Sequence, residues 1–365
     1  MRKRLYQLLR KTRPHAALTL QYAAELDRNQ WLSGEEIEQI SWQKLKRLLN
    51  HAFATVPFYR QKFQELGLHP QDIQRPEDFR QLPLLNKDDI RRNENAFISE
   101  KFTKETMTRA VTSGSSGAPF VVYHDLDAEA ASTAAFARSR SWFNVEFGDK
   151  VAWIWGRRDE ISGGFKQQII YWLKREKWFD GYRPDPDRLQ QYAVELATWQ
   201  PHLIAGYTNV IYLLAQHIKR RNIKGITPRM IETTGMPLLP YERKLIESVF
   251  QCPVSDRYGS HETLSVVAAE CPQGKRHVFS DLCYLEILVD GRPAAPGERG
   301  EVVPDRIEVT IQPAEGFTPQ TADFIRRRCM EILDNEPVDL EITVVDEISP
   351  TASGKHLVTT SDVPL

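Results

Sequence analysis

Between about residue 105 and residue 260, short apolar runs alternate with longer stretches whose apolar residues recur at helical spacing. Strands that alternate with helices in this way pair in parallel and carry helices on their faces. The alternation therefore predicts an α/β fold with a parallel or mixed sheet flanked by helices. The expected strands are 150–156, 202–207, 229–235 and 253–259, and the expected helices are 187–200, 209–223 and 238–250.

Four polar, glycine-containing turns follow predicted strands in this part of the chain. In open α/β sheets, ligands bind outside the carboxyl ends of the strands, where such turns gather. We therefore expect the four turns to meet at one rim and to form a binding site. Trp153 and Trp155 are expected in the core rather than in this site. The turns are 112–119, 206–209, 233–237 and 258–263.

The first of these turns, TSGSSGAP, has the chemistry of a polyphosphate-binding loop. Its glycines let backbone N–H groups approach a ligand closely, and its hydroxyl groups add further hydrogen-bond donors. It lacks the lysine of a P-loop and the spacing of a dinucleotide-binding or nucleophile-elbow motif. A flexible Ser/Gly linker is the alternative, although apolar runs flank the turn closely. The residues expected to contact phosphate are Thr112, Ser113, Gly114, Ser115, Ser116 and Gly117.

The composition of the 365-residue chain, 41% hydrophobic and 27% charged, is that of a folded globular protein. Its net charge of −1 creates no field that would attract nucleic acid, so no such partner is expected. The stretch 15–26 reads as an amphipathic helix, and no integral membrane segment is expected. The basic cluster at 2–13 has two interpretations, a transient contact with a membrane surface or a solvated helix face. We expect a cytoplasmic protein.

Upstream of residue 105 the pattern is helical. Apolar residues recur at helical spacing across 32–56, where Ser33 is the expected N-cap. The pattern restarts after Pro57, and another short helix is expected within 83–93. These elements form a helical N-terminal segment, 1–104.

Four cysteines form neither a CxxC pair nor a dense framework. Cys271, His277 and Cys283 lie within one stretch, but three potential ligands at such loose spacing make a poor zinc site. Free thiols in a reducing compartment are the preferred interpretation, and no structural metal is expected.

Three ordered motifs carry a family resemblance. TSGSSGAP, YGSHE (258–262) and SPTASGK (349–355) resemble the phosphate loop, the Tyr-Gly-x-x-Glu segment and the C-terminal Gly-Lys loop of adenylate-forming enzymes. The stretches 48–68 and 206–218 look like the phenylacetate-CoA ligase branch, including its members in capsular polysaccharide gene sets. The resemblance spans nearly the whole chain, and three motifs in order are more specific than any one alone.

The resemblance implies a large adenylation domain followed by a small α+β domain. Enzymes of this family use ATP to convert a carboxylic acid into an acyl-adenylate, with release of pyrophosphate. The acyl group then usually passes to a thiol such as coenzyme A. The resemblance therefore implies a ligase with ATP, Mg²⁺ and coenzyme A as cofactors and a small carboxylic acid as substrate.

The same resemblance assigns nucleotide-binding roles to particular residues. Thr112 to Gly117 would hold the β- and γ-phosphates of ATP. Tyr258 would stack on the adenine with Gly259 beside it, and Gly235 would lie along the other side of the base. Each of these residue types suits its role, because aromatic rings stack on bases and glycines admit close contact.

The resemblance also assigns the groups that act on the substrate. Glu262 would hold Mg²⁺, and Lys355, the catalytic lysine, would reach the substrate carboxylate and a bridging oxygen. Charge neutralisation and alignment are what phosphoryl chemistry requires, so a metal-binding carboxylate and a lysine fit these roles. Gly206 and Tyr207 would border the acyl pocket, and His261 is expected to pack or hydrogen-bond rather than act as a base.

The chain also departs from the family pattern. After 297–303, family members continue to a Thr/Ser-Gly-Asp, whose Asp binds the ribose, and then to a hinge. No such triplet occurs downstream of Glu262. The remaining residues read as a strand, a helix and a second strand at 306–312, 318–333 and 339–348. We expect an adenylation domain, 1–303, and a truncated β-α-β C-terminal domain, 304–365.

Two functions therefore remain open. The first is an ATP-dependent carboxylate-activating ligase, complete or impaired in the second half-reaction by the internal deletion. The second is a catalytically inactive relative that acts as a binding or scaffold protein, or a truncated gene product. ATP–pyrophosphate exchange separates the two, whereas the identity of the acid, the acceptor and the oligomeric state are not readable from the residues.

Overall fold

A computed structural model gives the arrangement of the chain, which divides into two compact units. The first comprises the described parts of 1–111 and 121–284, and the second the described parts of 112–120 and 285–365. The residues that the structure describes are 14–85, 87–112, 120–156, 165–182, 184–260, 266–289, 292–294, 306–311 and 339–344.

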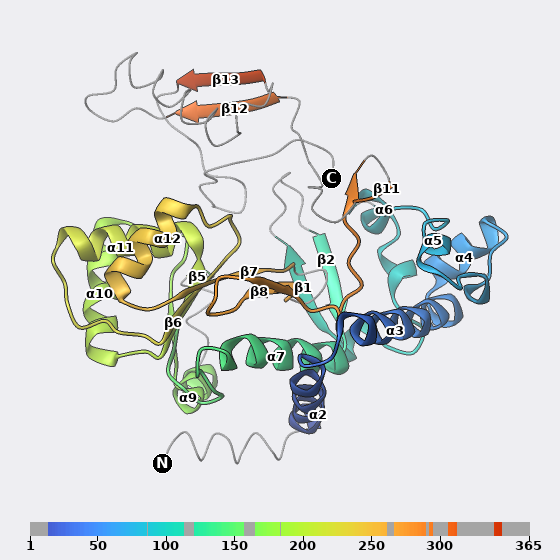
Figure 1. Ribbon diagram of the computed structural model, residues 1–365, viewed down its shortest axis with the longest axis horizontal. Coiled ribbons are helices and arrows are strands. Elements are labelled where there is room, and N and C mark those ends of the chain that lie inside the picture. Colours follow the sequence, from blue (N-terminus) through green and yellow to red (C-terminus); the bar gives the residue numbers. More distant parts are fainter. Residues whose placement is uncertain are drawn as a thin grey trace. The chain divides into compact units, whose positions relative to one another are not determined.

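The N-terminal part of the first unit is helical, as predicted (Figure 1). Ser33 is the N-cap of α3 (Gly34–Thr55): its backbone N–H donates to Glu36 at 2.8 Å, and its hydroxyl accepts from the Glu36 N–H at 3.3 Å. Pro57 opens the next helix, because proline fits a first helical turn and not an interior. The other elements before residue 107 are α2 (Pro14–Asn29), α4 (Pro57–Glu65), η1 (Pro70–Asp72), α5 (Pro76–Phe79), α6 (Lys87–Arg92), η2 (Glu94–Phe97) and η3 (Lys104–Thr106).

The predicted amphipathic helix near the N-terminus is α2, which packs along α7 (Leu126–Ser141). Its Leu26 is fully buried against Ala134 and Ala135 of α7, whereas Leu20 is 45% exposed. None of the described helices is long and apolar enough to cross a membrane. The apolar side of α2 is therefore used within the fold.

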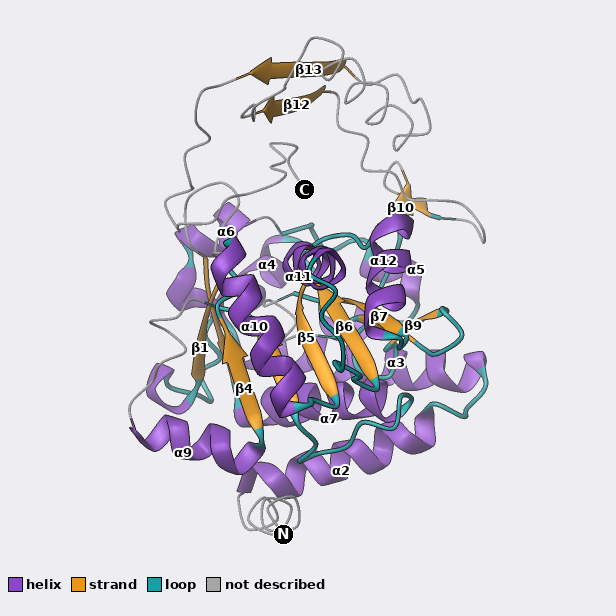
Figure 2. Ribbon diagram, turned by 90° about the vertical axis from the view of Figure 1, so that its left-hand side faces the viewer, coloured by secondary structure: helices purple, strands orange, loops and turns teal. Residues whose placement is uncertain are grey.

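A seven-stranded sheet forms the centre of the first unit, with strand order β4-β3-β5-β6-β7-β8-β9 (Figure 2). The strands from β4 to β7 are parallel, whereas β8 and β9 are added antiparallel. The four strands predicted from apolar runs are confirmed, and β4, β8 and β9 were not expected. The strands are β3 (Val151–Ile154), β4 (Glu176–Phe179), β5 (Leu203–Tyr207), β6 (Met230–Thr234), β7 (Val254–Tyr258), β8 (Ala268–Glu270) and β9 (Arg276–Val278).

Helices cover both faces of this sheet, as the fold class requires. Figure 1 shows α10, α11 and α12 together on one side, and α7 on the other. Alternate residues of β5 follow this division: Ile204 packs with α10, α11 and α12, while Leu203 and Ala205 pack on the opposite face. The helices are α7 (Leu126–Ser141), α9 (Phe165–Lys174), α10 (Pro186–Trp199), α11 (Thr208–Arg220) and α12 (Pro240–Phe250).

The strands β1 (Thr108–Thr112) and β2 (Phe120–His124) form a separate two-stranded sheet. The loop between them is the predicted phosphate loop, and its residues 113–119 lie outside the described part of the chain. Thr112 is the last residue of β1. The loop thus follows a strand, as expected, but not a strand of the central sheet.

The described parts of the second unit contain two further strand pairs. β10 (Leu288–Val289) pairs antiparallel with β11 (Arg292–Pro293). β12 (Arg306–Ile311) pairs in parallel with β13 (Asp339–Val344), in the register Arg306 to Asp339. Both strands predicted for the β-α-β unit are confirmed, and their parallel pairing requires a crossover connection. The predicted helix 318–333 lies outside the described residues, and the boundary between 303 and 304 stays a prediction.

Candidate active site

The carboxyl ends of the parallel strands meet at one edge of the central sheet. Ile154 of β3 is opposite Gly206 of β5, and Tyr207 is opposite Thr234 of β6. β7 joins in the same direction and ends at Tyr258. Three of the four predicted turns therefore start at one rim, whereas the fourth follows β1 in the separate sheet. This rim is the candidate active site.

Tyr207 lies at the centre of an aromatic cluster at this rim. Its ring stacks on Trp155, with centroids 4.2 Å apart and planes tilted by 21°. Tyr182 approaches the ring edge-on at 5.8 Å, and the two tyrosine hydroxyls are 3.4 Å apart. Trp155 is half-buried and does not lie in the core, so the expectation for this residue was wrong. Trp153 is also half-buried and stacks on Trp178 at 5.3 Å.

Two glycines make room for the Tyr207 ring, and a third allows β5 to lie close to β3. A Cβ on Gly181 or on Gly235 would lie 3.0 Å from the Tyr207 ring, closer than ordinary packing allows. Gly235 also has a φ of 83°, a conformation that favours glycine. A Cβ on Gly206 would come within 2.6 Å of the Ile154 carbonyl oxygen. The predicted residues Gly206, Tyr207 and Gly235 are thus brought together.

A hydrogen bond joins the turns after β5 and β6. Thr208, the first residue of α11, is buried, and its hydroxyl donates to the carbonyl oxygen of Met236 at 2.9 Å. The turns after β3 and β4 are joined in the same way, because the Gly181 N–H donates to the Gly156 carbonyl oxygen at 3.0 Å. Adjacent turns along the rim are therefore tied to each other, and the turn after Tyr207 is tied to the one after β6.

Tyr258 ends β7 with its side chain exposed. The residue is 60% exposed, although the four residues before it in the strand are all buried. Large aromatic rings are usually well covered, so an exposed ring at the carboxyl end of a strand provides a surface on which a planar ligand can stack. Gly259 follows it at the same rim.

A buried ion-pair network supports the rim from the α7 side of the sheet. The Glu232 carboxylate on β6 accepts hydrogen bonds from Arg140 of α7 at 2.9 and 3.0 Å and lies 3.5 Å from the Nε of Arg257 on β7. Glu232 is only 2% exposed. Burial acts to raise the pKa of Glu232, but the charges of Arg140 and Arg257 outweigh it and hold the pKa below its ordinary value.

A second polar cluster fixes β7 from the other face. Asp256 accepts from the Thr233 hydroxyl at 3.2 Å and pairs with Arg276 of β9. Burial raises the pKa of Asp256. Glu270 of β8 accepts from Arg243 of α12 at 2.6 Å and from the Asp256 N–H at 3.0 Å. β7 is therefore bound through side chains to β6, β8, β9 and α12.

The remaining predicted site residues are only partly covered by the structure. Thr112 ends β1, and Tyr258 and Gly259 lie at the carboxyl end of β7. Sequence reasoning missed Gly181 and Tyr182, because β4, which precedes them, is short and begins with two charged residues. The predicted residues that lie outside the described part of the chain are Ser113, Gly114, Ser115, Ser116, Gly117, His261, Glu262 and Lys355.

No zinc site forms at Cys271, His277 and Cys283. Within the described residues, no group of three or more His, Cys, Asp or Glu side chains could hold a metal ion. Cys271 donates to Gln273 at 3.1 Å, and Cys283 donates to the Phe279 carbonyl oxygen at 3.4 Å. Both cysteines are free thiols.

Solved structures with the same arrangement define the class of fold. A crystal structure of 2-hydroxyisobutyryl-CoA ligase in the postadenylation state aligns with a TM-score of 0.64 at 15% identity, covering 87% of this chain and 88% of that chain. An open conformation of that ligase, in complex with 2-HIB-AMP and CoA, aligns with a TM-score of 0.55 at 19% identity, covering 72% and 62%. The fold is that of the adenylate-forming ligases.

Comparison with curated relatives narrows the class of protein further than the fold does, although no protein-family model matches the sequence. The protein CapK of Staphylococcus aureus is 27% identical over 239 residues, which cover 62% of this chain and 51% of CapK. The phenylacetate-coenzyme A ligase of Escherichia coli K12 is 28% identical over 297 residues, which cover 76% of this chain and 65% of the ligase. This chain is a homologue of phenylacetate-coenzyme A ligases and CapK. It matches about half to two thirds of their length.

Proposed function

We propose that this chain activates a small carboxylic acid as an acyl-adenylate, using ATP and Mg²⁺, and passes the acyl group to coenzyme A. The observation that carries the proposal is the exposed Tyr258 ring at the same rim as the Tyr207 cluster. A stacking surface beside an aromatic pocket wall suits a nucleotide and an acyl group bound next to each other. The homology with phenylacetate-coenzyme A ligases supports this assignment.

The proposed roles follow the positions of the residues along the rim. Tyr258 stacks on the adenine, and Gly259 leaves its outer face open to the base. Gly235 lines the opposite side, where the absence of a Cβ keeps the Tyr207 ring in place. Tyr207, with Trp155 stacked on it, forms a wall of the acyl pocket. These residues bind and orient the adenine and the acyl group, and none of them acts as a nucleophile.

Apart from Thr112, the residues that would hold the phosphate and carboxylate groups lie outside the described part of the chain. We assign the triphosphate to Thr112 to Gly117, Mg²⁺ to Glu262, and the substrate carboxylate to Lys355. Mg²⁺ supplies charge neutralisation to the phosphates when bound. Lys355 places a positive charge where negative charge develops as the carboxylate oxygen attacks the α-phosphorus and pyrophosphate leaves.

The missing ribose-binding triplet weakens the hold on the nucleotide, and the missing hinge limits the second half-reaction. Without that carboxylate, the chain loses charge-assisted hydrogen bonds that would orient the ribose. The stretch 301–306, EVVPDR, contains Pro304, which stiffens the connection where relatives carry a hinge. We propose that adenylation by the 1–303 domain persists while thioester formation, which depends on movement of the small domain, is slow. We also propose that the protein acts in the cytoplasm.

Binding of ATP to the variants Tyr258→Ala and Tyr258→Phe tests the assignment of the nucleotide site. Loss of a base-stacking ring costs about 1 to 3 kcal/mol, so Tyr258→Ala should weaken ATP binding by roughly 5- to 150-fold. Tyr258→Phe keeps the ring and should bind as the wild type does. Thermal shift with ATP, with and without Mg²⁺, measures both.

Stability without ligand provides the control for this experiment, because substitution of an exposed side chain should change it little. Equal ATP-induced shifts in wild type and Tyr258→Ala would contradict the adenine assignment. An absence of any ATP-induced shift in the folded wild-type chain would instead favour an inactive relative that serves as a binding protein.

A further inference from the structure

Positive charge is concentrated in the first 24 residues of the chain. This stretch contains six lysines and arginines and no aspartate or glutamate, whereas the rest of the chain contains 42 basic and 49 acidic residues. Clusters of this size next to apolar residues are typical of segments that bind anionic lipid. Leucines at positions 5, 8 and 9 are interleaved with the basic residues, which are Arg2, Lys3, Arg4, Arg10, Lys11 and Arg13.

The basic segment leads directly into α2, whose two halves differ in charge. From His15 to Ala24 the helix has no acidic residue, and both of its acids, Glu25 and Asp27, belong to the second half. The exposed residues of the first half are uncharged: Ala17, Leu20, Gln21 and Ala24. The first half of α2 therefore presents an uncharged, partly apolar surface beside a basic segment.

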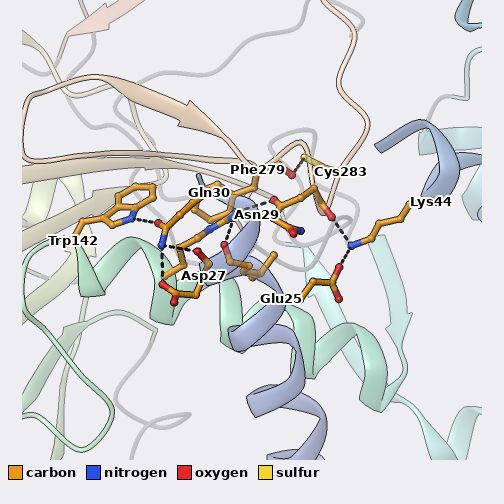
Figure 3. Close-up of polar contacts among 11 residues, drawn as sticks. Glu25, Asp27, Asn29, Gln30, Lys44, Trp142, Phe279 and Cys283 are labelled. Atoms are coloured by element: carbon orange, nitrogen blue, oxygen red, sulfur yellow. Dashed lines mark hydrogen bonds and ion pairs between the residues drawn. The ribbon is translucent and has the colours of Figure 1, made fainter. Parts of the chain in front are cut away.

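Polar contacts fix the second half of α2 in the fold, as Figure 3 shows. Lys44 of α3 donates to the Glu25 carboxylate at 2.6 Å and to the Asp281 carbonyl oxygen at 2.7 Å. Trp142 donates from its indole Nε1 to the side-chain oxygen of Gln30 at 3.0 Å. Because these contacts hold α2 in place, the exposed surface of its first half keeps a fixed position in the first unit.

Three acids at the start of α7 lie beside the first half of α2, and all three are engaged. Asp125 caps α7 by accepting from a backbone N–H at 2.8 Å, and Asp127 accepts from the Tyr22 hydroxyl at 2.5 Å. The Glu129 carboxylate lies 3.7 Å from the His15 ring. Three negative charges against six positive charges leave this region positive. An anionic partner is therefore complementary to it.

The helix α9 presents a second surface of the same kind. Ile169 and Trp172, one helical turn apart, are 42% and 53% exposed. No acidic residue occurs from 161 to 175, and Lys174 ends the helix. Figures 1 and 2 both show α9 and α2, which belong to the same unit, at its lower end. Exposed tryptophan and aliphatic side chains next to basic residues are typical of helices that lie on a bilayer surface.

We propose that this end of the first unit docks on the surface of an anionic lipid bilayer. The basic residues of 2–13 supply the attraction, and Leu20 of α2 with Ile169 and Trp172 of α9 enter the boundary between head groups and acyl chains. Neither contribution is strong alone, and the two add up in interfacial binding. The proposal does not depend on the reaction at the rim, because none of these residues belongs to the candidate active site.

Sedimentation of the full chain with vesicles tests the proposal. One set of vesicles contains phosphatidylcholine alone, and the other also contains phosphatidylserine at about 30%. At about 0.1 M salt, the chain should bind the anionic vesicles at least about 100-fold more tightly, and higher salt should weaken this binding by screening. Equal binding to the two kinds of vesicle, or binding to neither, would overturn the proposal.

Substitutions in the basic segment measure the attraction. Each basic residue near an anionic surface strengthens binding about fivefold, so the combination of Arg2→Gln, Lys3→Gln and Arg4→Gln should weaken it roughly 100-fold. Unchanged binding by this variant would contradict the role of the segment.

Substitutions in α9 measure the apolar contact. The combination of Ile169→Ser and Trp172→Ser should weaken binding to the anionic vesicles about tenfold, because less apolar surface enters the bilayer. The matched control combines Val194→Ser and Leu213→Ser, at positions 52% and 36% exposed on α10 and α11, and it should bind as the wild type does. If the α9 variant bound as tightly as the wild type, the basic segment alone would be responsible and the assignment of the surface would be wrong. Tighter binding to random-sequence RNA than to the vesicles, unchanged in the α9 variant, would assign the segment to nucleic acid instead.

Fluorescence quenching locates the surface that meets the bilayer. Lipids with brominated acyl chains quench only those indoles that enter the bilayer, and Trp172 is one of eight tryptophans. Binding to such vesicles should quench part of the wild-type fluorescence, and Trp172→Phe, which keeps an apolar ring, should bind without this loss. Quenching of the same size in Trp172→Phe would show that another surface enters the bilayer and would contradict the proposal.

Discussion

Gly225 and Gly235 have nearly the same positive φ, 84° and 83°, but different surroundings. A Cβ on Gly225 would have no atom within 4 Å, whereas one on Gly235 would lie 3.0 Å from the Tyr207 ring. The two positions therefore share the conformational cost of a side chain and differ only in its packing. At the residue scale, comparing these two positions measures how much the absence of a Cβ beside the Tyr207 ring contributes to stability.

Alanine at each position separates the two effects. Gly225→Ala should lower the free energy of unfolding by about 1 to 2 kcal/mol, the cost of left-handed backbone for an alanine. Gly235→Ala should lower the free energy of unfolding by this amount and by about 1 to 3 kcal/mol more, because the added methyl group displaces the Tyr207 ring. Urea unfolding of the three proteins measures the difference. Equal losses in the two variants would contradict the close packing of Gly235 against Tyr207.

Glu232 connects three elements, since its carboxylate on β6 pairs with Arg140 of α7 and Arg257 of β7. Glu232→Gln should lower the free energy of unfolding by about 3 to 5 kcal/mol at pH 7, because it removes the buried carboxylate that pairs with Arg140 and with the buried Arg257. The matched control is Glu195→Gln. Its carboxylate pairs with Lys177 at 3.1 Å on the surface, and its loss should cost about 0 to 1 kcal/mol.

The same carboxylate predicts a pH dependence. Its pKa is lowered in the folded state, so its contribution to stability is complete above the ordinary value of 4.5 and is lost as the pH falls through the folded pKa. The stability gap between wild type and Glu232→Gln should therefore stay constant from pH 7 to about 5 and shrink below 4.5. Urea unfolding across this range measures the gap. A gap that widens on acidification would show that the arginines do not hold the pKa down.

At the scale of the whole molecule, periodicity predicts most of the central sheet and not its margins. β3, β5, β6 and β7 are apolar runs between helices, so their pairing in parallel could be expected. β4 begins with Glu176 and Lys177, and β8 and β9 have three residues each, which is too short for a periodic signal. Their places in the sheet depend on contacts distant in sequence.

In the candidate site, too, the sequence predicts the positions of some residues but not the contacts between their side chains. The glycine-containing turns predicted the positions of Gly206, Tyr207 and Gly235 at one edge, because parallel strands bring their carboxyl ends together. The stacking of Trp155 on Tyr207 could not be predicted, since an aromatic residue next to a strand is equally compatible with the core. Such a contact depends on the packing of side chains and not on their order.

The central claim is that this chain forms acyl-adenylates, and ATP–pyrophosphate exchange tests it most directly. The exchange is measured with and without each member of a panel of carboxylic acids that includes phenylacetate, and Lys355→Ala is the control variant. We predict exchange that requires one of the acids, is lost in Lys355→Ala, and is faster than formation of the corresponding coenzyme A thioester. The account would be contradicted if the folded wild-type chain, under conditions where it binds ATP, catalysed no acid-dependent exchange.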